Sequence, residues 1–266
     1  MCFDGGVRRV VRIPDDVYEV VMNGIEKVKM REKDSEDRKT CDEVFDKGTL
    51  LAIYKLICDG YFKILDFPIS TGKEGNVFRA VKDDGTYVAV KIYRVSTLTF
   101  RSISRYIYGD PRFRGTKRRR LLIATWAKKE FKNLMRAMDA GVRVPRPIRQ
   151  WENVLVMEYI GDDIGPAPLI KDVDLDDPER YFEILKNAIR NLYVNGKMVH
   201  GDISEYNVMV FREEPVIIDW AQGVVIQHPM AMEWLRRDIR NILRYFSRIG
   251  VKVPSEEDMM RFVVGG

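Results

Sequence analysis

Three polar residues near the end of the sequence have types and spacings that suit phosphoryl transfer. They lie in the string VHGDISEYNVMVFREEPVIIDWA, residues 199–221, where Asn207 follows Asp202 by five residues and Asp219 follows Asn207 by twelve. Asp202 could orient or accept the proton of an attacking hydroxyl, while the amide oxygen of Asn207 and the carboxylate of Asp219 could hold Mg²⁺. The spacing resembles the H-R-D-x-x-x-x-N and D-F-G signatures. It predicts an ATP site that uses Mg²⁺, with Mn²⁺ as an alternative metal.

The same residues have a purely structural alternative. Asp202 could cap its own loop, and Asn207 and Asp219 could be polar residues that flank a hairpin. The surroundings favour catalysis, because the string follows a predicted helix that stops at Gly196 and contains an apolar hairpin that ends at Asp219. We expect a structural role for His200, as a hydrogen-bond partner of the backbone near the metal site.

A lysine and a glutamate in apolar surroundings are predicted to form an ion pair. Lys91 interrupts the strand-like run VAVKIYRV, and Glu130 borders the apolar stripe of a predicted helix over residues 119–140. The stripe consists of Ala127, Phe131, Leu134 and Met138. A charge among apolar side chains needs a partner of opposite sign. Lys91 could then hold the α- and β-phosphates; the alternative is an edge-strand lysine that points to water.

Two further segments are assigned to the nucleotide. The string STGKEGNV, residues 70–77, lies between two predicted strands, where backbone N–H groups could meet phosphate. It matches neither G-x-G-x-x-G nor G-x-x-x-x-G-K-[ST], so a plain hairpin turn is the alternative. The string VLVMEYIG would meet adenine, although a buried strand that leaves a sheet has the same sequence. The candidate nucleotide contacts are Ser70, Thr71, Gly72, Lys73, Glu74, Val77, Ala89, Lys91, Glu130, Met157, Glu158, Ile160 and Met209.

Composition limits the class of protein. The chain has 266 residues, of which 45% are apolar and 32% charged, which suits one large domain or two lobes that share a cleft. Its three cysteines form no CxxC pair and its two histidines are too few for a His-rich metal site, so we expect a reduced, cytoplasmic protein without structural zinc. No apolar run is long enough for secretion or for a membrane span.

The net charge of +5 is concentrated in one segment. Residues 101–120 carry eight Lys or Arg against one acid, Asp110, so the rest of the chain is slightly acidic. Aromatic residues are interspersed with the arginines: Tyr106, Tyr108 and Phe113. A flexible, solvated basic loop over residues 101–118 is the default interpretation. Contact with an RNA-containing surface, through phosphates and stacked bases, is the alternative.

The predicted elements describe an α+β chain. A helix is expected from an N-cap at Thr49 to Gly60, followed by strands over 62–69, 76–81 and 87–93 and by a strand pair joined at Glu152-Asn153. Helices dominate afterwards, with one N-capped by Asp177, one near 230–249 and one that starts with a capping box at Ser255. This order predicts an N-terminal helical extension over 1–48, a β-rich N-lobe with hinge over 49–160, and a helical C-lobe over 161–266.

Together, these residues resemble the RIO family of atypical serine/threonine protein kinases, in particular its Rio-one branch. The matching blocks are STGKEGNVF, KIYRVSTLTF, YGDPRFR, WAKKEFKNLMRA, HGDISEYNVM, IIDWAQ and HPMAMEWLRRDIRNI. The resemblance covers about residues 44–250. It implies a two-lobed protein-kinase-like fold without an activation loop or peptide-docking subdomains. It also implies autophosphorylation on serine, ATP hydrolysis and action on the small ribosomal subunit during its maturation.

The resemblance assigns a role to each candidate residue. Lys91 would hold the phosphates with Glu130 as its partner, Asp202 would be the catalytic aspartate, and Asn207 and Asp219 would bind the metal. Asp219 also matches the residue at which an aspartyl-phosphate has been proposed in the family. A nucleotide-gated assembly factor, in which ATP hydrolysis times release from a ribosomal precursor, is the alternative function, because no peptide platform is recognisable.

Three positions depart from the expected patterns. Gly201 replaces the arginine of H-R-D, which is consistent with a missing activation loop. Ala221 replaces the glycine of D-F-G, which puts a backbone flip at that point in doubt. Gly75 stands where the family often has alanine, and we expect this change to be harmless.

Overall fold

The structure is a computed structural model that describes residues 45–265, except 73, 96–99, 114–115 and 117. The predicted extension over residues 1–48 therefore lies almost entirely outside the described residues, and so does Lys73.

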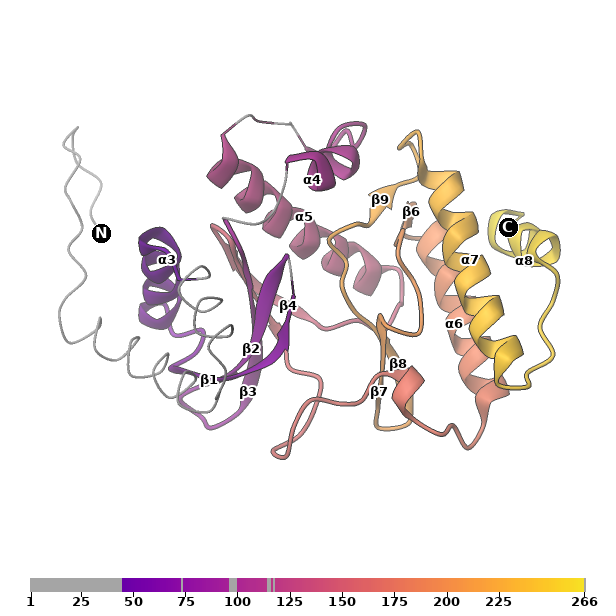
Figure 1. Ribbon diagram of the computed structural model, residues 1–266, viewed down its shortest axis with the longest axis horizontal. Coiled ribbons are helices and arrows are strands. Elements are labelled where there is room, and N and C mark those ends of the chain that lie inside the picture. Colours follow the sequence, from indigo (N-terminus) through magenta and orange to yellow (C-terminus); the bar gives the residue numbers. More distant parts are fainter. Residues whose placement is uncertain (1–44, 73, 96–99, 114–115, 117, 266) are drawn as a thin grey trace.

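The first half of the described chain contains one antiparallel sheet together with helices (Figure 1). Its strands are β1 (Ile64–Thr71), β2 (Gly75–Val81), β3 (Tyr87–Tyr93), β4 (Pro147–Trp151) and β5 (Val154–Glu158). The strand order β1-β2-β3-β5-β4 makes β3 the central strand of the sheet. The connections between β2 and β3 and between β4 and β5 are tight hairpins, as predicted. In the β2–β3 hairpin, Asp84 accepts a hydrogen bond from the Thr86 N–H at 3.0 Å, and Gly85 adopts a φ of +79°.

Helix α3 (Lys47–Cys58) covers the sheet with Ala52, Ile53 and Leu56, which are buried with Phe62 and Phe78.

The start of α3 differs from the prediction. The N-cap is Asp46, whose side chain accepts from the Thr49 N–H at 2.7 Å, so the predicted N-cap Thr49 lies inside the helix. Thr49 is fully buried, and its hydroxyl accepts a hydrogen bond from Asn153 Nδ2 in the β4–β5 turn at 2.9 Å. A tertiary contact thus uses the side chain that local sequence rules assigned to a cap.

The basic segment contains a helix where a loop was predicted. Helix α4 (Phe100–Ile107) buries Ile103, Tyr106 and Ile107, which follow the i, i+3, i+4 spacing of a helix face. Beyond it, Asp110 is buried and accepts hydrogen bonds from both the backbone and the side chain of Arg112. The loop prediction was therefore wrong for residues 101–107, where polar residues such as the exposed Arg105 concealed this short apolar pattern.

Helix α5 (Arg119–Asp139) packs against β4 and β5 and joins the sheet to the rest of the molecule (Figure 1). Its extent is close to the prediction, but its buried face is rotated: Met138 is exposed, whereas Glu130 is 1% exposed. The buried face consists of Leu122, Ile123, Trp126, Ala127, Lys129, Glu130, Asn133, Leu134 and Ala137. Glu130 therefore lies at the centre of this face, not at its border.

The second half of the described chain is mainly helical. It contains a short 3-10 turn (Ile170–Asp172), α6 (Pro178–Val194), α7 (Ala231–Arg248), α8 (Glu256–Val264), and the two-stranded pairs β6 (Met198–Val199) with β9 (Val224–Val225) and β7 (Val208–Phe211) with β8 (Glu214–Ile217). The predicted caps are confirmed, since Asp177 accepts from the Arg180 N–H and Ser255 from the Asp258 N–H. Among the described residues, no helix has the length and apolarity required to cross a membrane.

Candidate active site

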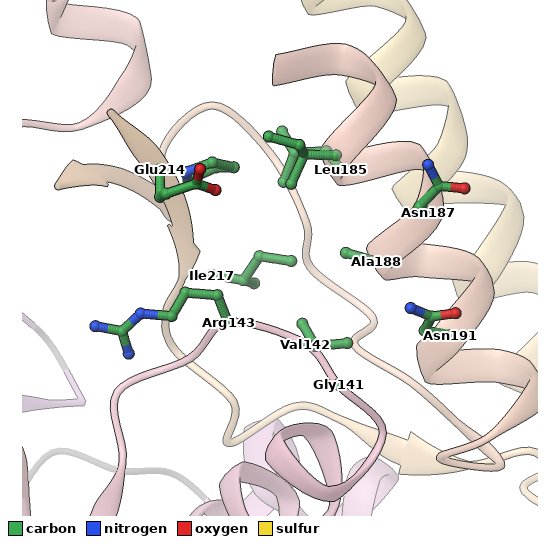
Figure 2. Close-up of a pocket in the computed structure, with 11 residues that line it drawn as sticks. Gly141, Val142, Arg143, Leu185, Asn187, Ala188, Asn191, Glu214 and Ile217 are labelled. Atoms are coloured by element: carbon green, nitrogen blue, oxygen red, sulfur yellow. The ribbon is translucent and has the colours of Figure 1, made fainter. Parts of the chain in front are cut away.

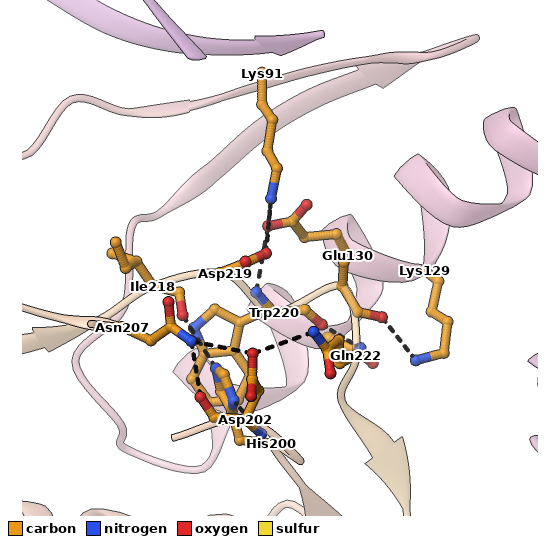
Figure 3. A network of polar contacts seen from close by, with 12 residues as sticks. Lys91, Lys129, Glu130, His200, Asp202, Asn207, Ile218, Asp219, Trp220 and Gln222 are labelled. Atoms are coloured by element: carbon orange, nitrogen blue, oxygen red, sulfur yellow. Dashed lines mark hydrogen bonds and ion pairs between the residues drawn. The ribbon is translucent and has the colours of Figure 1, made fainter. Parts of the chain in front are cut away.

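A lysine bridges two carboxylates where the sheet meets the helical half (Figure 3). Lys91 lies on the central strand β3, and its Nζ donates to Glu130 Oε1 on α5 and to Asp219 Oδ1 beyond β8, at 2.9 Å each. The side chains of Lys91 and Glu130 are 12% and 1% exposed, whereas that of Asp219 is 37% exposed. The ion pair expected between Lys91 and Glu130 is present; the second bond, to Asp219, was not expected.

The surroundings shift the pKa values of Lys91, Glu130 and Asp219 in different ways. Burial raises the pKa of Glu130 to about 7, because the attraction of Lys91 does not fully compensate for lost hydration. Burial alone would lower the pKa of Lys91, but Asp219 and Glu130 outweigh it and raise that pKa above its ordinary value. Lys91 in turn lowers the pKa of Asp219. Lys91 therefore stays charged, and Asp219 is the partner that an incoming anion can replace.

A second group of side chains surrounds Asp202. Asn207 Nδ2 donates to the backbone oxygen of Asp202 at 2.8 Å and to its Oδ2 at 3.3 Å, and Gln222 Nε2 donates to Oδ2 at 3.1 Å. Burial and the neighbouring Asp219 raise the pKa of Asp202. In the described part of the chain no protein donor meets Asp202 Oδ1, which is the oxygen left for an incoming hydroxyl.

The loop that carries Asp202 is held by buried polar residues. Asp238 on α7 accepts from the backbone N–H groups of Gly201 at 2.7 Å and Ile203 at 2.9 Å. His200 has the structural contact that we expected, with its Nε2 3.1 Å from the Ile218 oxygen, while its Nδ1 accepts from the Asp202 N–H. Burial lowers the pKa of His200 to about 4, so it is neutral near pH 7. The loop is thus fixed from two sides.

Asp219 is held in a strained backbone conformation. Its φ is +61°, in the left-handed region that non-glycine residues rarely occupy. Helix α5 fixes the turn that follows: Asn133 Nδ2 donates to the oxygens of Trp220 and Gly223, both at 2.7 Å, and Lys129 Nζ donates to the Ala221 oxygen at 3.0 Å. The backbone at Ala221 is therefore tied to α5 in this structure.

These anchoring residues have a recognisable spacing in the sequence, although we did not predict their role. Trp126, Lys129, Glu130 and Asn133 repeat at spacings of three and four, so the polar members lie on the apolar face of one helix. Asp238 likewise lies between Trp234 and Ile242 on the buried face of α7. Polar residues in such positions need partners, and here the partners are the backbones around Asp202 and Asp219.

The proposed phosphate loop is the β1–β2 hairpin. Ser70 and Thr71 are exposed at the end of β1, and the turn is closed by a hydrogen bond from the Gly72 N–H to the Gly75 oxygen at 3.0 Å. Burial and Asp219 raise the pKa of Glu74, so this carboxyl group belongs electrostatically to the site.

Gly75, which stands where the family often has alanine, has a structural reason in this chain. A Cβ at this position would lie 2.3 Å from the Ile92 oxygen on β3, so an alanine requires the backbone to shift. At Gly72 the nearest atom to such a Cβ is at 3.5 Å, which is an ordinary contact. The glycine at 75 is therefore required by the close approach of β2 to β3 in this chain.

The residues assigned to adenine lie around the end of β5. Ala89 on β3 pairs with Met157 on β5, next to the pair of Val88 with Glu158. The Glu158 N–H donates to the Arg146 oxygen and its carboxylate binds Arg143, so neither group is available to a base. The Ile160 oxygen accepts from the Ala167 N–H, while the N–H of Ile160 has no backbone partner among the described residues.

The two remaining candidate nucleotide contacts are Val77 and Met209. Val77, half-buried on β2, pairs with Lys91 across the β2–β3 ladder. Met209, half-buried on β7, bridges to Leu169. Both therefore come from elements that adjoin the site, one from each half of the molecule.

A pocket in another part of the described structure lacks residues suited to phosphoryl transfer (Figure 2). It has a volume of about 320 Å³ and lies between the connection after α5, α6 and β8, away from Lys91 and Asp202. Its charged residues Arg143 and Glu214 are paired with Glu158 and Arg180. We therefore place the site at Lys91, Asp202 and Asp219, not in this pocket.

The donor set fits Mg²⁺. Asn207 uses its amide nitrogen on Asp202, which leaves its oxygen as a ligand, and Asp219 supplies a partly exposed carboxylate. Among the described residues no group of three or more His, Cys, Asp or Glu side chains is placed to hold a metal. Mg²⁺ needs no such group when phosphate oxygens and water complete its octahedron.

Comparison with known proteins places the chain in a family. A model of the family described as RIO domain matches residues 76–259. The RIO-type serine/threonine-protein kinase Rio1 of Haloferax volcanii is 43% identical over 238 residues, which cover 89% of this chain and 81% of that protein. The Rio1 of Methanocaldococcus jannaschii is 43% identical over 231 residues, covering 86% and 79%.

Solved structures agree with this placement. The Rio2 kinase from Chaetomium thermophilum, in a complex described as ADP/Mg²⁺-phosphoaspartate, has a TM-score of 0.62 and 26% identity, and covers 80% of this chain and 66% of that one. The predicted α+β, protein-kinase-like architecture, with a β-sheet N-lobe and a helical C-lobe, is confirmed. The chain belongs to the RIO family of atypical serine/threonine protein kinases, in its Rio1 branch.

Proposed function

We propose that this chain uses MgATP to phosphorylate serine, on itself or on a partner, and that it also hydrolyses ATP. The observation that carries the proposal is the placement of Lys91 between Glu130 and Asp219, in the same network as Asp202 and Asn207. The Haloferax relative is named a serine/threonine-protein kinase, and the Rio2 kinase of Chaetomium thermophilum is described in complex with ADP and Mg²⁺. Both descriptions support this function for a member of the same family.

The geometry assigns a task to each residue. Lys91, which Glu130 holds in place, would exchange its bond to Asp219 for bonds to the α- and β-phosphates. Asn207 and Asp219 would hold Mg²⁺, which when bound offsets the charge of the phosphates. Asp202 Oδ1 would accept a hydrogen bond from the attacking hydroxyl and take its proton. The N–H of Ile160 and the carbonyl of Glu158 suit the donor and acceptor edge of adenine.

The test is incubation of the purified chain with γ-labelled ATP and Mg²⁺. Label should appear both on the protein and as free phosphate, and chelation of the metal should abolish both products. Protein-bound label that is stable to hydroxylamine indicates phosphoserine, whereas labile label indicates an acyl phosphate, for which Asp219 is the candidate. If neither product forms although the protein is folded, the proposed function is wrong.

A second function is favoured by one observation. Helix α7 begins at Ala231, and between it and Asp219 the described chain holds only β9 and turns, so there is little room for a loop that docks a peptide. ATP hydrolysis could then time the release of a bound assembly instead of modifying a protein substrate. In the same labelling experiment, free phosphate would then exceed protein-bound label many times over.

We further propose that the partner is a small ribosomal subunit precursor, bound through RNA. Two residues of the predicted RNA contact need revision, because Tyr106 is 2% exposed and Arg120 pairs with Asp46, whereas Tyr108 is 51% exposed. The exposed basic residues on α5 and at its N-cap are Arg118, Arg119, Lys128 and Lys132. They belong to the same helix that carries Glu130.

Replacing both Arg118 and Arg119 by alanine should weaken RNA binding and reduce the salt dependence of the binding constant, because fewer phosphate counterions are released. The slope of log K against log salt should fall by about 1 to 2. ATP affinity should not change. Replacement of Arg236 and Arg240 on α7, which pair with Glu256, is the matched control. An unchanged slope would show that this surface does not contact RNA.

A further inference from the structure

A chain of hydrogen bonds leads from α4 to Asp202. Arg105 Nη2 donates to the Tyr106 hydroxyl at 2.9 Å, the hydroxyl donates to Gln222 Oε1 at 2.6 Å, and Gln222 Nε2 donates to Asp202 Oδ2 at 3.1 Å. Figure 3 shows Gln222 beside Asp202, on the turn that follows Asp219. The tasks assigned to Lys91, Asn207 and Asp219 do not explain why these hydrogen bonds are present.

The direction of each hydrogen bond is fixed by the chemistry of the two ends. A guanidinium can only donate, so it occupies an acceptor position of the Tyr106 hydroxyl. The hydroxyl donates its one proton to Gln222 Oε1, so the amide oxygen faces α4. The NH₂ group of Gln222 consequently points toward Asp202, whose carboxylate oxygen accepts. Without the hydroxyl, the two orientations of this amide would differ less in energy.

The tyrosine at the centre of this chain is rigidly placed. Its ring packs against Trp234 on α7, with centroids 4.7 Å apart, and against Trp126 on α5 at 5.7 Å. His228 Nε2 lies 3.1 Å from the Arg105 oxygen, and its ring stacks on Trp234. The end of α4 is thus fastened to α7 and α5, and the hydroxyl meets Gln222 at a defined point.

As a result, the two carboxylate oxygens of Asp202 have different hydrogen-bond partners. Oδ2 receives two amide donors, from Gln222 and Asn207, and the described residues leave Oδ1 without one. Asn207 is also the candidate metal ligand, so its bond to Asp202 is shared with another task. Gln222, in contrast, donates to the Asp202 carboxylate and has no assigned role in metal binding.

We propose that Gln222 is a positioning residue for Asp202, and that helix α4 sets the orientation of Gln222 through the hydroxyl of Tyr106. The proposal rests on the proposed function, because it takes Asp202 as the catalytic carboxylate. It gives α4, which lies in the basic segment, an influence on the rate of the chemical step through Tyr106 and Gln222.

The kinetic test uses replacements that preserve shape. Gln222→Met keeps the length of the side chain and should lower kcat by about 10- to 100-fold, as expected for a lost hydrogen bond to a charged group. Tyr106→Phe should lower kcat by about tenfold. The KM for ATP should stay within about twofold in both, since the phosphates are held elsewhere. In the Gln222→Met background, Tyr106→Phe should have no further effect, because the hydroxyl acts only through the amide.

The matched control is Tyr245→Phe. Tyr245 is also buried, and its hydroxyl donates to the Ile170 oxygen at 2.8 Å, outside the hydrogen-bond chain to Asp202. This variant should lose stability like Tyr106→Phe but keep its kcat. Equal kcat for Gln222→Met and the wild type, or additive effects of the two replacements, would overturn the positioning role while leaving the proposed function intact. A wild-type chain without turnover would overturn both.

A spectroscopic measurement checks the contact without relying on turnover. The chain has three glutamines, Gln150, Gln222 and Gln227, so selective ¹⁵N labelling of glutamine side chains gives few amide signals, and Gln222→Met assigns the relevant one. Tyr106→Phe should shift the Gln222 signal, and Tyr245→Phe should not. An unmoved signal in Tyr106→Phe would show that the hydroxyl does not orient the amide.

Discussion

Replacing Asp202 by alanine should lower kcat for ATP turnover and for autophosphorylation by about 10²- to 10⁴-fold. Asp202 Oδ1 is the carboxylate oxygen without a protein donor among the described residues, so it is the group that can receive the proton of a hydroxyl or water. The affinity for MgATP should change little, because Lys91, Asn207 and Asp219 remain. Nucleotide binding by calorimetry and turnover with labelled ATP measure the two effects separately.

The control for this variant is Asp174→Ala, which removes an exposed aspartate from the connection that precedes α6. Its turnover should equal that of the wild type. Asp202→Asn adds a finer comparison, since the amide retains the shape but cannot take a proton at neutral pH. If Asp202→Ala turns over ATP at nearly the normal rate, the catalytic role of Asp202 is wrong.

The residues that carry the chemistry could be proposed from the sequence because their spacing is local. Asp202, Asn207 and Asp219 lie within one hairpin and its flanks, and Lys91 stands out in an apolar strand. The strands were also predictable, since β1 to β3 and β4 to β5 are joined by short turns with distinct turn residues. Their roles in catalysis stay predictions until the variants are measured.

The residues that orient this chemistry could not be proposed because their partners are distant in the sequence. Gln222 meets Tyr106 across 116 positions, and Asn133 meets the turn around Gly223 across 90. Such contacts depend on how α4 and α5 pack against the helical half, which no local pattern encodes. The same reason explains Thr49, where Asn153 competes for the side chain that sequence rules assign to a cap.

Replacing Lys91 by methionine should abolish turnover and also destabilise the fold by about 3 to 5 kcal/mol. The loss of stability arises because Glu130, 1% exposed, would lose its cation and would have to stay charged without a partner or take up a proton, and its Oε2 already has no hydrogen-bond partner among the described residues. Glu130→Gln should destabilise less, since Lys91 still pairs with Asp219. Denaturant unfolding of each variant measures these differences.

The pH dependence of stability separates the buried charge from other causes. The folded-state pKa of Glu130 is raised by burial to about 7, above its ordinary 4.5. Its contribution to stability is therefore fully present below pH 4.5 and is lost as the pH rises through 7. In Lys91→Met this loss should extend to higher pH, because the attraction that limits the rise in pKa is gone. In Glu130→Gln this part of the pH dependence should vanish.

The double variant decides between an unpaired charge and lost packing. Lys91→Met combined with Glu130→Gln leaves no charge at the buried position, so it should be more stable than Lys91→Met alone above about pH 7, although it should be equally inactive. Asp238, whose pKa burial raises to about 8, titrates in the same range in every variant, so only differences between variants are informative. If the double variant is no more stable than Lys91→Met, the destabilisation comes from lost packing of the lysine side chain and not from an unpaired Glu130.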